Sequence, residues 1–270
     1  RDIIKVASVR SRELMEGYLW LRASQFQKDT GLEAISTLEK ALTKGALKGV
    51  VLDLRNNPGG VLGASVDMAG AVLDGGLVVY TEGRHPQAAD RYEAAAGDLL
   101  NGTPIVVLIN GGSASASEIV AGALQDRRRA VIMGTRSFGK GSVQTILPVS
   151  DTRAVKLTTA LYYTPDGRSI QAEGIVPDIV VERAEVKSVE SERRTKEADL
   201  QGSLSGGDPV DAQSESESLT ELRNSDNQLY EALTLLRGIN LLTPETAPVA
   251  EIEVELEIEE AAATVVTDTP

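Results

Sequence analysis

The sequence has 270 residues and contains no cysteine, one histidine and only 3% aromatic residues. The lack of cysteine excludes disulfide bonds, a thiolate nucleophile and cysteine-based zinc sites. The single histidine, His85, lies in a short polar stretch, and such a loop histidine is usually a solvated surface residue. These absences disfavour a serine hydrolase triad that uses histidine and exclude a metal site built from several histidines. We therefore expect neither a metal ion nor another cofactor.

A long apolar run is also absent. No stretch approaches the roughly 20 apolar residues that cross a membrane, and the sequence shows no signal peptide. Residues 2–9 are nevertheless strand-like from the start. We therefore interpret the chain as a piece of a longer protein, which leaves open a targeting signal outside it.

Basic residues are scarce in one part of the chain only. The net charge is −13, yet residues 1–183 hold 20 acidic and 21 basic residues, whereas residues 184–270 hold 20 acidic and 6 basic residues. Binding to nucleic acid depends on basic side chains that neutralise phosphates. We therefore expect no nucleic-acid partner.

Short apolar runs alternate with amphipathic segments over the nearly neutral part. The pattern predicts strands at 2–9, 17–23, 50–55, 77–80, 105–109, 130–133, 142–149, 154–163 and 177–181, helices at 30–48, 62–73 and 119–124, and a loop at 82–103. Strands that alternate with helices indicate an α/β core with a largely parallel sheet. We place this core at residues 1–183.

The composition changes after the core. Residues 184–217 have the polar composition of a linker. The C-terminal extension, residues 218–270, begins with leucines at helical spacing over 219–242, which indicate either a helix folded back on the core or a helix for oligomerisation or partner docking. Residues 251–258 alternate between glutamate and apolar residues, as in a strand, although their charge could equally leave them solvated.

The most informative stretch is residues 110–118, which joins the apolar run 105–109 to the apolar segment 119–124. Two glycines permit a sharp turn, and a serine there would sit at a helix N-terminus, where N–H groups and the helix dipole stabilise negative charge. This arrangement suits the nucleophile of acyl transfer. The alternative is ordinary helix capping by serine.

A serine nucleophile needs a base, and with histidine disfavoured the candidate is lysine. A lysine can act as a base only in its neutral form, which burial and the lack of a carboxylate partner favour. Lys140 fits, because it lies between glycines with no acidic residue within ten positions. Gln144 could hold it by a hydrogen bond without adding charge. The alternative is a phosphate-binding lysine, although the P-loop pattern is absent.

Four motifs in this order along the chain together resemble the carboxyl-terminal processing peptidases, also called tail-specific proteases. They are Leu-Asp-Leu-Arg-Asn-Asn-Pro-Gly-Gly (52–60), Asn-Gly-Gly-Ser-Ala-Ser-Ala-Ser-Glu-Ile (110–119), Phe-Gly-Lys-Gly-Ser-Val-Gln (138–144) and Tyr-Thr-Pro-Asp-Gly-Arg-Ser-Ile (163–170). The resemblance covers about residues 2–182 and implies a ClpP/crotonase-like α/β protease core. It also implies a serine endopeptidase that works through a Ser/Lys dyad.

The resemblance also assigns roles to single residues. It implies Ser115 as the nucleophile, Lys140 as the base and Gln144 as the residue that orients the lysine. Ser113 and Ser117 then become turn and cap residues. The backbone N–H of Ala116, with that of Gly59 or Gly60, would form the oxyanion hole.

The family binds protein or peptide substrates by their C-terminal ends, helped by a PDZ domain that is absent from this chain. The resemblance further implies a periplasmic setting, a homo-oligomer formed through the C-terminal extension and, in some bacterial members, a lipoprotein adaptor. Two alternatives stay open: a silent binding or scaffold protein, and an acyl-CoA enzyme on the same fold. For the acyl-CoA enzyme, Glu118 is the candidate carboxylate.

Overall fold

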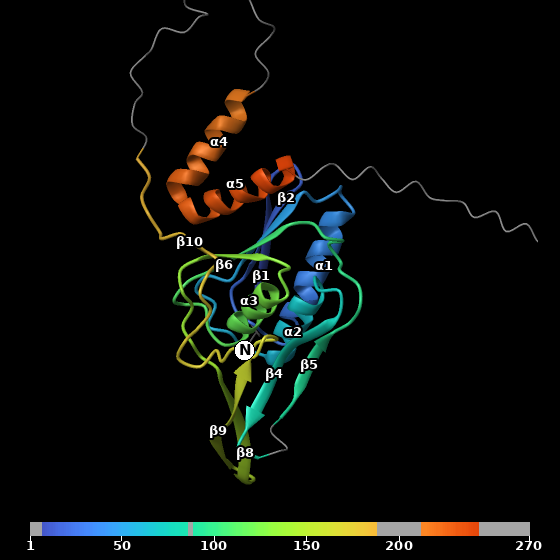
Figure 1. Cartoon of the computed structure of the whole chain (residues 1–270), viewed down its shortest axis with the longest axis vertical. Coiled ribbons are helices and arrows are strands. Elements are labelled where there is room, and N and C mark those ends of the chain that lie inside the picture. Colours follow the sequence, from blue (N-terminus) through green and yellow to red (C-terminus); the bar gives the residue numbers. More distant parts are fainter. Residues whose placement is uncertain (1–6, 86–88, 188–211, 243–270) are drawn as a thin grey trace, which may run out of the picture.

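The computed structural model describes residues 7–85, 89–187 and 212–242, and it contains two β-sheets (Figure 1). The larger sheet has six strands in the order β1-β2-β3-β6-β7-β10. Strand β1 is antiparallel to β2, and all the other neighbours are parallel. The bounds are β1 Val9–Met15, β2 Tyr18–Ala23, β3 Gly49–Asp53, β6 Ile105–Ile109, β7 Val131–Gly134 and β10 Ile179–Val180.

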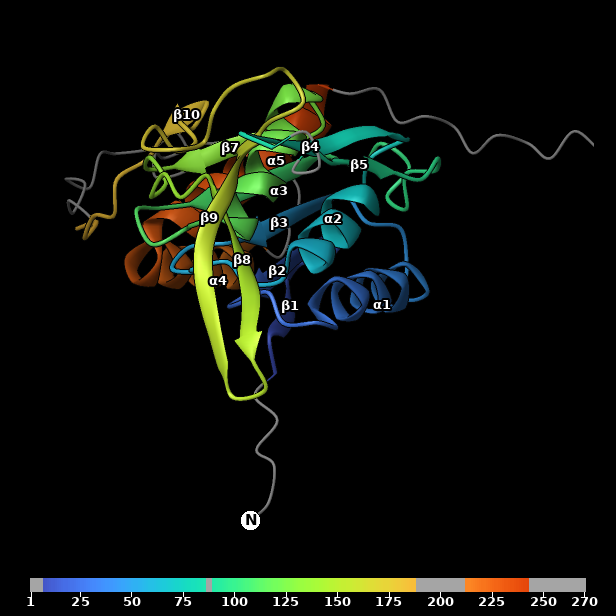
Figure 2. The ribbon, with the colours of Figure 1, turned by 90° about the horizontal axis from the view of Figure 1, so that it is seen from below.

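Three helices cover one face of this sheet: α1 Thr30–Leu42, α2 Leu62–Gly70 and α3 Ala116–Asp126 (Figure 2). Strands β3 and β6 are buried along their whole length, as expected for parallel strands covered on both faces. Alternate residues such as Leu52 and Val107 pack with the three helices in the main core. Their neighbours Val51 and Val106 point to the opposite face.

Helix α5, Asn227–Leu242, covers that opposite face. Its buried residues Leu229, Ala232, Leu233 and Leu236 recur every three or four positions, which gives one apolar stripe. Helix α4, Ala212–Ser225, precedes it and packs partly against it. The segment predicted as one helix over 219–242 is therefore the end of α4 and the whole of α5, and α5 is folded back on the core. A role in oligomerisation stays a prediction. Leu241 and Leu242, at the end of α5, are almost fully exposed.

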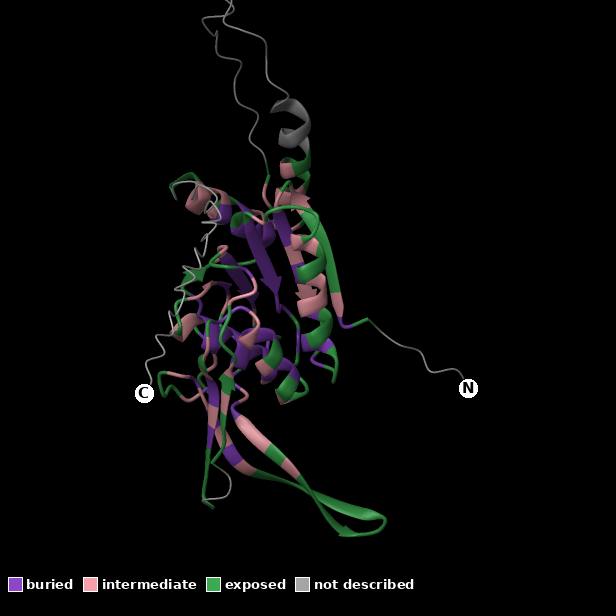
Figure 3. Ribbon diagram, turned by 90° about the vertical axis from the view of Figure 1, so that its right-hand side faces the viewer, coloured by how far each residue is buried: buried purple, intermediate pink, exposed green. Residues whose placement is uncertain are grey.

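The smaller sheet is antiparallel, with strands in the order β5-β4-β9-β8. Its bounds are β4 Gly76–Gly83, β5 Arg91–Ala94, β8 Ser142–Ser150 and β9 Arg153–Tyr163. The β8–β9 hairpin projects from the body of the molecule, and its outer part is exposed (Figure 3). The base of the hairpin follows directly on the loop that carries Lys140.

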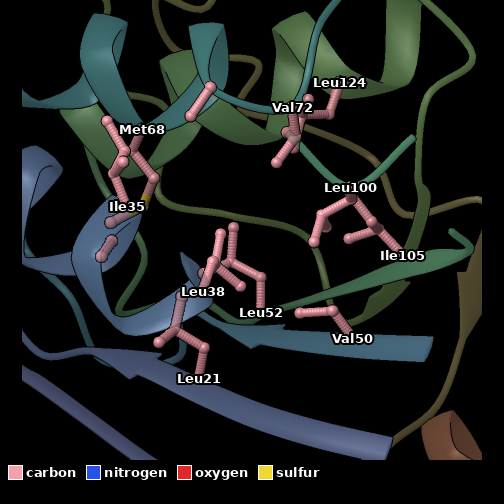
Figure 4. A pocket seen from close by; sticks show the side chains of 12 residues that line it. Leu21, Ile35, Leu38, Val50, Leu52, Met68, Val72, Leu100, Ile105 and Leu124 are labelled. Carbon is pink, nitrogen blue, oxygen red and sulfur yellow. The ribbon is translucent and has the colours of Figure 1, made fainter. Parts of the chain in front are cut away.

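A small cavity lies between the three helices and the large sheet (Figure 4). Its volume is about 20 Å³, and apolar side chains such as Leu38, Met68 and Leu124 line it. A cavity of this kind has no polar partners for water and is too small for a ligand. We therefore regard it as a packing defect of the core. None of the helices in the described ranges has the length and apolar character that a membrane crossing requires.

Several predicted elements differ from the observed ones. The hairpin predicted at 142–149 and 154–163 is present, but the helix predicted at 30–48 ends at Leu42, because glycine and polar residues follow it. Strand β5 lies inside the predicted loop 82–103, since pairing with β4 decides its conformation. Helix α4 begins inside the predicted linker 184–217. The predicted strand 251–258 lies outside the described residues.

Candidate active site

Ser115 lies at the turn between β6 and α3, where it is the N-cap residue of the helix. Its φ is 55° and its ψ is −113°, which is a rare and strained conformation for a residue with a Cβ atom. Such strain persists only where the surroundings enforce it, and it clusters at functional sites. The positive end of the helix dipole lies beside this serine, although the N–H groups of Ser117 and Glu118 already donate to the carbonyls of Ala114 and Ser115.

The neighbouring serines have structural roles in the turn. Both Ser113 and Ser117 are fully buried. The Ser113 hydroxyl donates to the carbonyl of Leu54 at 2.8 Å, and the Ser117 hydroxyl donates to the carbonyl of Asn57 at 2.9 Å. Both bonds tie the Ser115 turn to the segment that follows β3. Ser115 itself is half-buried, so it is the one serine of the three that a substrate can reach.

Glu118 joins the serine to the lysine loop. Its carboxylate is completely buried and accepts four hydrogen bonds. Oε2 accepts the backbone N–H of Ser115 at 2.7 Å and that of Lys140 at 2.9 Å. Oε1 accepts the hydroxyl of Ser137 at 2.6 Å and the N–H of Gly139 at 2.5 Å. One carboxylate oxygen therefore holds the backbones of both predicted dyad residues.

Lys140 lies in the loop between β7 and β8 and is half-buried. The loop is fixed on both sides of the lysine: Phe138 N–H donates to the Ser113 carbonyl at 3.0 Å, and Gly141 N–H donates to Gln171 Oε1 at 3.1 Å. Within the described ranges, the lysine ammonium makes no ion pair. The lack of a carboxylate partner that was predicted for a lysine base thus holds for the side-chain nitrogen only, because the Glu118 carboxylate binds the backbone N–H of Lys140.

Gln144 lies on β8, four residues after Lys140, next to an irregularity in the pairing with β9. The residue is exposed, and its amide forms no hydrogen bond with the described residues. The structure therefore does not join Gln144 to Lys140 by a hydrogen bond, and the predicted orienting role stays a prediction.

The turn after β3, residues 56–60, lies against the Ser115 turn. A Cβ atom built on Gly59 would stand 2.5 Å from the carbonyl oxygen of Ala114 and 2.9 Å from the nitrogen of Ala116. Gly59 also has a φ of 92°, so only glycine fits this approach. Asn57 is buried and fixes the turn, because it accepts the N–H of Gly59 and donates to the carbonyl of Ala23, both at 2.9 Å.

The candidate oxyanion donors differ in whether their N–H groups are occupied. Gly59 N–H is used by Asn57 Oδ1. Among the described residues, the N–H groups of Gly60 and Ala116 donate to no acceptor. Unoccupied backbone donors are the groups that an oxyanion hole needs; Ala116 directly follows the strained Ser115, and Gly60 directly follows Gly59, which lies against the Ser115 turn.

A polar cluster behind the turn is a feature that the sequence analysis missed. Asp53 is fully buried at the end of β3 and pairs with Arg55, whose Nη2 lies 2.7 Å from Asp53 Oδ2. Both residues belong to the motif at 52–60, but the sequence analysis predicts them only as part of the strand 50–55. The signal that could have found them is two opposite charges within an otherwise apolar strand, since buried charges are normally paired.

A groove lies between β4 and the β8–β9 hairpin, with a volume of about 1110 Å³. It reaches Leu62, two residues after the glycine turn, and Val143 and Leu147 of β8 line it with apolar surface. His85 is also at this groove rather than at Ser115. In the described part of the chain, no group of three or more acidic, histidine or cysteine side chains could hold a metal ion.

Comparison with known proteins places this site in a family. The model of "Peptidase family S41" matches residues 17–181, which include the serine turn, the lysine loop and the glycine turn. The chain belongs to peptidase family S41. This family assignment agrees with the resemblance to carboxyl-terminal processing peptidases that the four motifs carry.

Two curated relatives and one solved structure define the match. A carboxy-terminal-processing protease of Bartonella bacilliformis is 49% identical over 244 residues, covering 88% of this chain and 56% of the relative. A carboxyl-terminal-processing protease of Synechocystis is 42% identical over 182 residues, covering 67% of this chain and 41% of the relative. The photosystem II D1 C-terminal processing protease has a TM-score of 0.58 at 35% identity, over 66% of this chain and 49% of that one. This chain thus spans about half the length of such relatives.

Proposed function

We propose that the protein is a serine endopeptidase of the carboxyl-terminal processing type and that it works through an acyl-enzyme on Ser115. The observation that carries this proposal is the Glu118 carboxylate, whose Oε2 binds the backbone N–H of both Ser115 and Lys140. A nucleophile and its base must be held in fixed relative positions, because small displacements reduce the rate strongly. Membership of peptidase family S41 supports the same reaction.

In the proposed mechanism, the neutral Lys140 amine takes the proton of the Ser115 hydroxyl. The serine oxygen forms a bond to the carbonyl carbon of the scissile peptide, and the carbonyl oxygen becomes the oxyanion. When the carbon–nitrogen bond breaks, the leaving amine receives the proton from Lys140. The neutral lysine then takes a proton from water as the water oxygen bonds to the carbonyl carbon of the acyl-enzyme. When the ester bond to Ser115 breaks, Lys140 returns that proton to the Ser115 oxygen, which restores the serine hydroxyl and the neutral amine and releases the carboxylic acid.

For the oxyanion hole we propose Ala116 and Gly60. The sequence left Gly59 and Gly60 as alternatives, and the hydrogen bond from Gly59 N–H to Asn57 favours Gly60. The close approach of Gly59 to Ala114 and Ala116 then brings the two turns together. Losing one oxyanion donor usually costs about 100-fold or more in rate.

The substrate is proposed to be an extended protein C-terminus. The groove along the β8–β9 hairpin supports this, because it is open, partly apolar and close to the glycine turn at Leu62. Apolar residues near the substrate terminus would pack against Val143 and Leu147. The relatives' printed names, which describe carboxyl-terminal processing, support the same class of substrate.

The two alternative functions fit the site less well. An acyl-CoA enzyme would need Glu118 as a free acid or base, but both of its oxygens already accept two hydrogen bonds each. A binding or scaffold protein would have no use for a strained serine beside two unoccupied N–H donors. We therefore prefer the peptidase.

Further proposals concern the whole protein. We propose a ClpP/crotonase-like core at residues 1–183 and an acidic helical extension that supports oligomerisation; this extension was predicted at 218–270, after a linker at 184–217, but its first helix already begins at Ala212. The exposed Leu241 and Leu242 favour a contact outside this chain. A periplasmic setting and a lipoprotein adaptor follow from the family resemblance alone. Sedimentation of the intact chain and of a Leu241→Ala/Leu242→Ala variant tests the oligomer: an unchanged monomer in both contradicts it.

The experiment that tests the proposed function is cleavage of an unfolded protein with a free apolar C-terminus. We expect cleavage by the wild type and none by Ser115→Ala or Lys140→Ala. Ser113→Ala and Ser117→Ala are the matched controls, which should lose stability but keep measurable cleavage. Equal cleavage by the wild type and Ser115→Ala contradicts the proposal. A silent wild type, tested also with the longer natural protein, favours the scaffold alternative.

A further inference from the structure

The junction between α4 and α5 meets the turn that carries the proposed oxyanion donor. Asp226, at this junction, lies 171 positions from Arg55 in the sequence, yet the two form a paired contact: Nη1 to Oδ1 at 2.8 Å and Nη2 to Oδ2 at 2.7 Å. A pair of parallel hydrogen bonds between arginine and a carboxylate fixes geometry as well as supplying energy. Arg55 is the residue immediately before the 56–60 turn.

Arg55 is held from both sides and is almost fully buried. Its Nε donates to Asp53 at 2.9 Å, while Nη1 also donates to Gln228 on α5 at 3.0 Å. Burial alone would lower the pKa of the guanidinium, but the carboxylates of Asp53 and Asp226 raise that pKa above its ordinary value. The arginine therefore stays charged, and it depends on both carboxylates to offset its desolvation.

Asp226 is itself held in place by the start of α5. Its Oδ1 accepts the N–H of Leu229 at 3.1 Å, which makes Asp226 the cap of α5. The next two residues anchor the helix to the chain after β10: Asn227 donates to the carbonyl of Glu182 at 2.8 Å, and Gln228 donates to that of Val181 at 2.6 Å. The start of α5 is thus a rigid support against which Arg55 is fixed.

We propose that Asp226 is a positioning residue for the peptidase reaction: through Arg55 it holds the 56–60 turn so that Gly60 N–H lies where the oxyanion forms. This inference rests on the proposed function. It makes the C-terminal helix pair a structural part of the active site, although α5 contributes no group that touches the substrate. Without Asp226, Arg55 has one carboxylate fewer and can shift toward solvent, and the turn that follows it shifts with it.

The test compares Asp226→Asn with Asp98→Asn in the full chain. Asp98 is a matched control, because it pairs with Arg129 at 2.9 Å and also accepts backbone N–H groups, but it supports the loop before β6 on the far side of the nucleophile helix. We expect Asp226→Asn to lower kcat at least tenfold with KM changed less than twofold, and to weaken inhibition by a peptide aldehyde in proportion. Asp98→Asn should lower only the melting temperature.

A second readout does not depend on activity. Hydrogen exchange of the amides at residues 56–60 should be faster in Asp226→Asn than in the wild type and unchanged in Asp98→Asn. An unchanged kcat, or an equal loss in both variants, overturns the positioning role. If the wild type cleaves nothing, the proposed function fails. The exchange comparison still tests whether Asp226 holds the 56–60 turn through Arg55, and unchanged exchange in Asp226→Asn refutes that link.

Discussion

Replacing Glu118 by glutamine is expected to disturb the contact between the Ser115 turn and the lysine loop. The carboxylate accepts four hydrogen bonds, whereas a glutamine amide accepts at only one of its two terminal atoms. The amide orientation of lowest free energy keeps the glutamine oxygen toward Ser115 and Lys140, since the backbone N–H groups of these two residues cannot rotate away. The amide nitrogen then faces Ser137, whose hydroxyl can rotate, and the N–H of Gly139, which cannot.

The magnitude follows from this geometry. The Gly139 N–H loses its acceptor in a buried place, which costs about 1–3 kcal/mol, and the remaining bonds lose the strengthening that a charged acceptor provides. We therefore expect the free energy of unfolding to fall by about 3 kcal/mol, which a domain with a stability of about 5–15 kcal/mol survives. Because Gly139 directly precedes Lys140, we expect the lysine to move and kcat to fall about 100-fold.

Chemical denaturation and the kinetics of peptide cleavage measure the two effects separately. The control is Asp178→Asn, since Asp178 accepts hydrogen bonds from Gln125 at 2.7 Å and from the N–H of Ile132 at 2.8 Å but, within the described ranges, accepts none from the lysine loop. This control should lose stability and keep its kcat. A Glu118→Gln protein with wild-type kcat, or one as stable as the wild type, would refute the argument.

Other substitutions test the turn, the C-terminal helix and the ion pair. Gly59→Ala should abolish cleavage and unfold the turn, whereas Gly63→Ala, in open space on a helix, should be neutral or stabilise the protein by about 0.5–1 kcal/mol in thermal melts. Leu233→Ala should cost about 2–4 kcal/mol in urea unfolding, whereas Leu32→Ala, at an exposed position on α1, should leave the unfolding midpoint unchanged. Burial would raise the pKa of Asp226, but the hydrogen bonds and charge of Arg55 have the larger effect and lower that pKa. The ionised Asp226 carboxylate therefore stabilises the folded protein above about pH 4, and this stabilisation is lost on further acidification. Asp226→Asn should therefore lose less stability below about pH 4 than the wild type does; an equal loss would contradict the sign of this shift.

The sequence predicted the α/β class and the elements around the serine, because apolar runs bounded by glycine mark them clearly. Strand β5 was missed, since four residues of mixed polarity become a strand only by pairing with β4. The position of α5 could not be decided either. Its leucine stripe is the same whether the helix covers its own sheet or a partner, and only the apolar residues on the second face of the sheet, such as Val51 and Val106, distinguish these cases.

At the site, the four motifs predicted through their family resemblance that the serine, the lysine and the glycine turn act together, and they left the connections between them open. Glu118 was considered only as a possible catalytic acid, although the structure shows it as the acceptor that holds the two loops together. Asp226 lies 171 positions from Arg55, and no local pattern could pair them. Contacts of this kind arise from the tertiary arrangement of elements that are far apart in the chain.

The most direct test of the central claim is to trap the acyl-enzyme. The protein is mixed with a peptide ester, quenched in acid within one turnover and analysed by mass spectrometry. We expect the acyl group on Ser115 in the wild type, in Ser113→Ala and in Ser117→Ala, and no adduct in Ser115→Ala or Lys140→Ala. An acyl group on another serine, or an adduct that persists in Ser115→Ala, would contradict the Ser115/Lys140 mechanism.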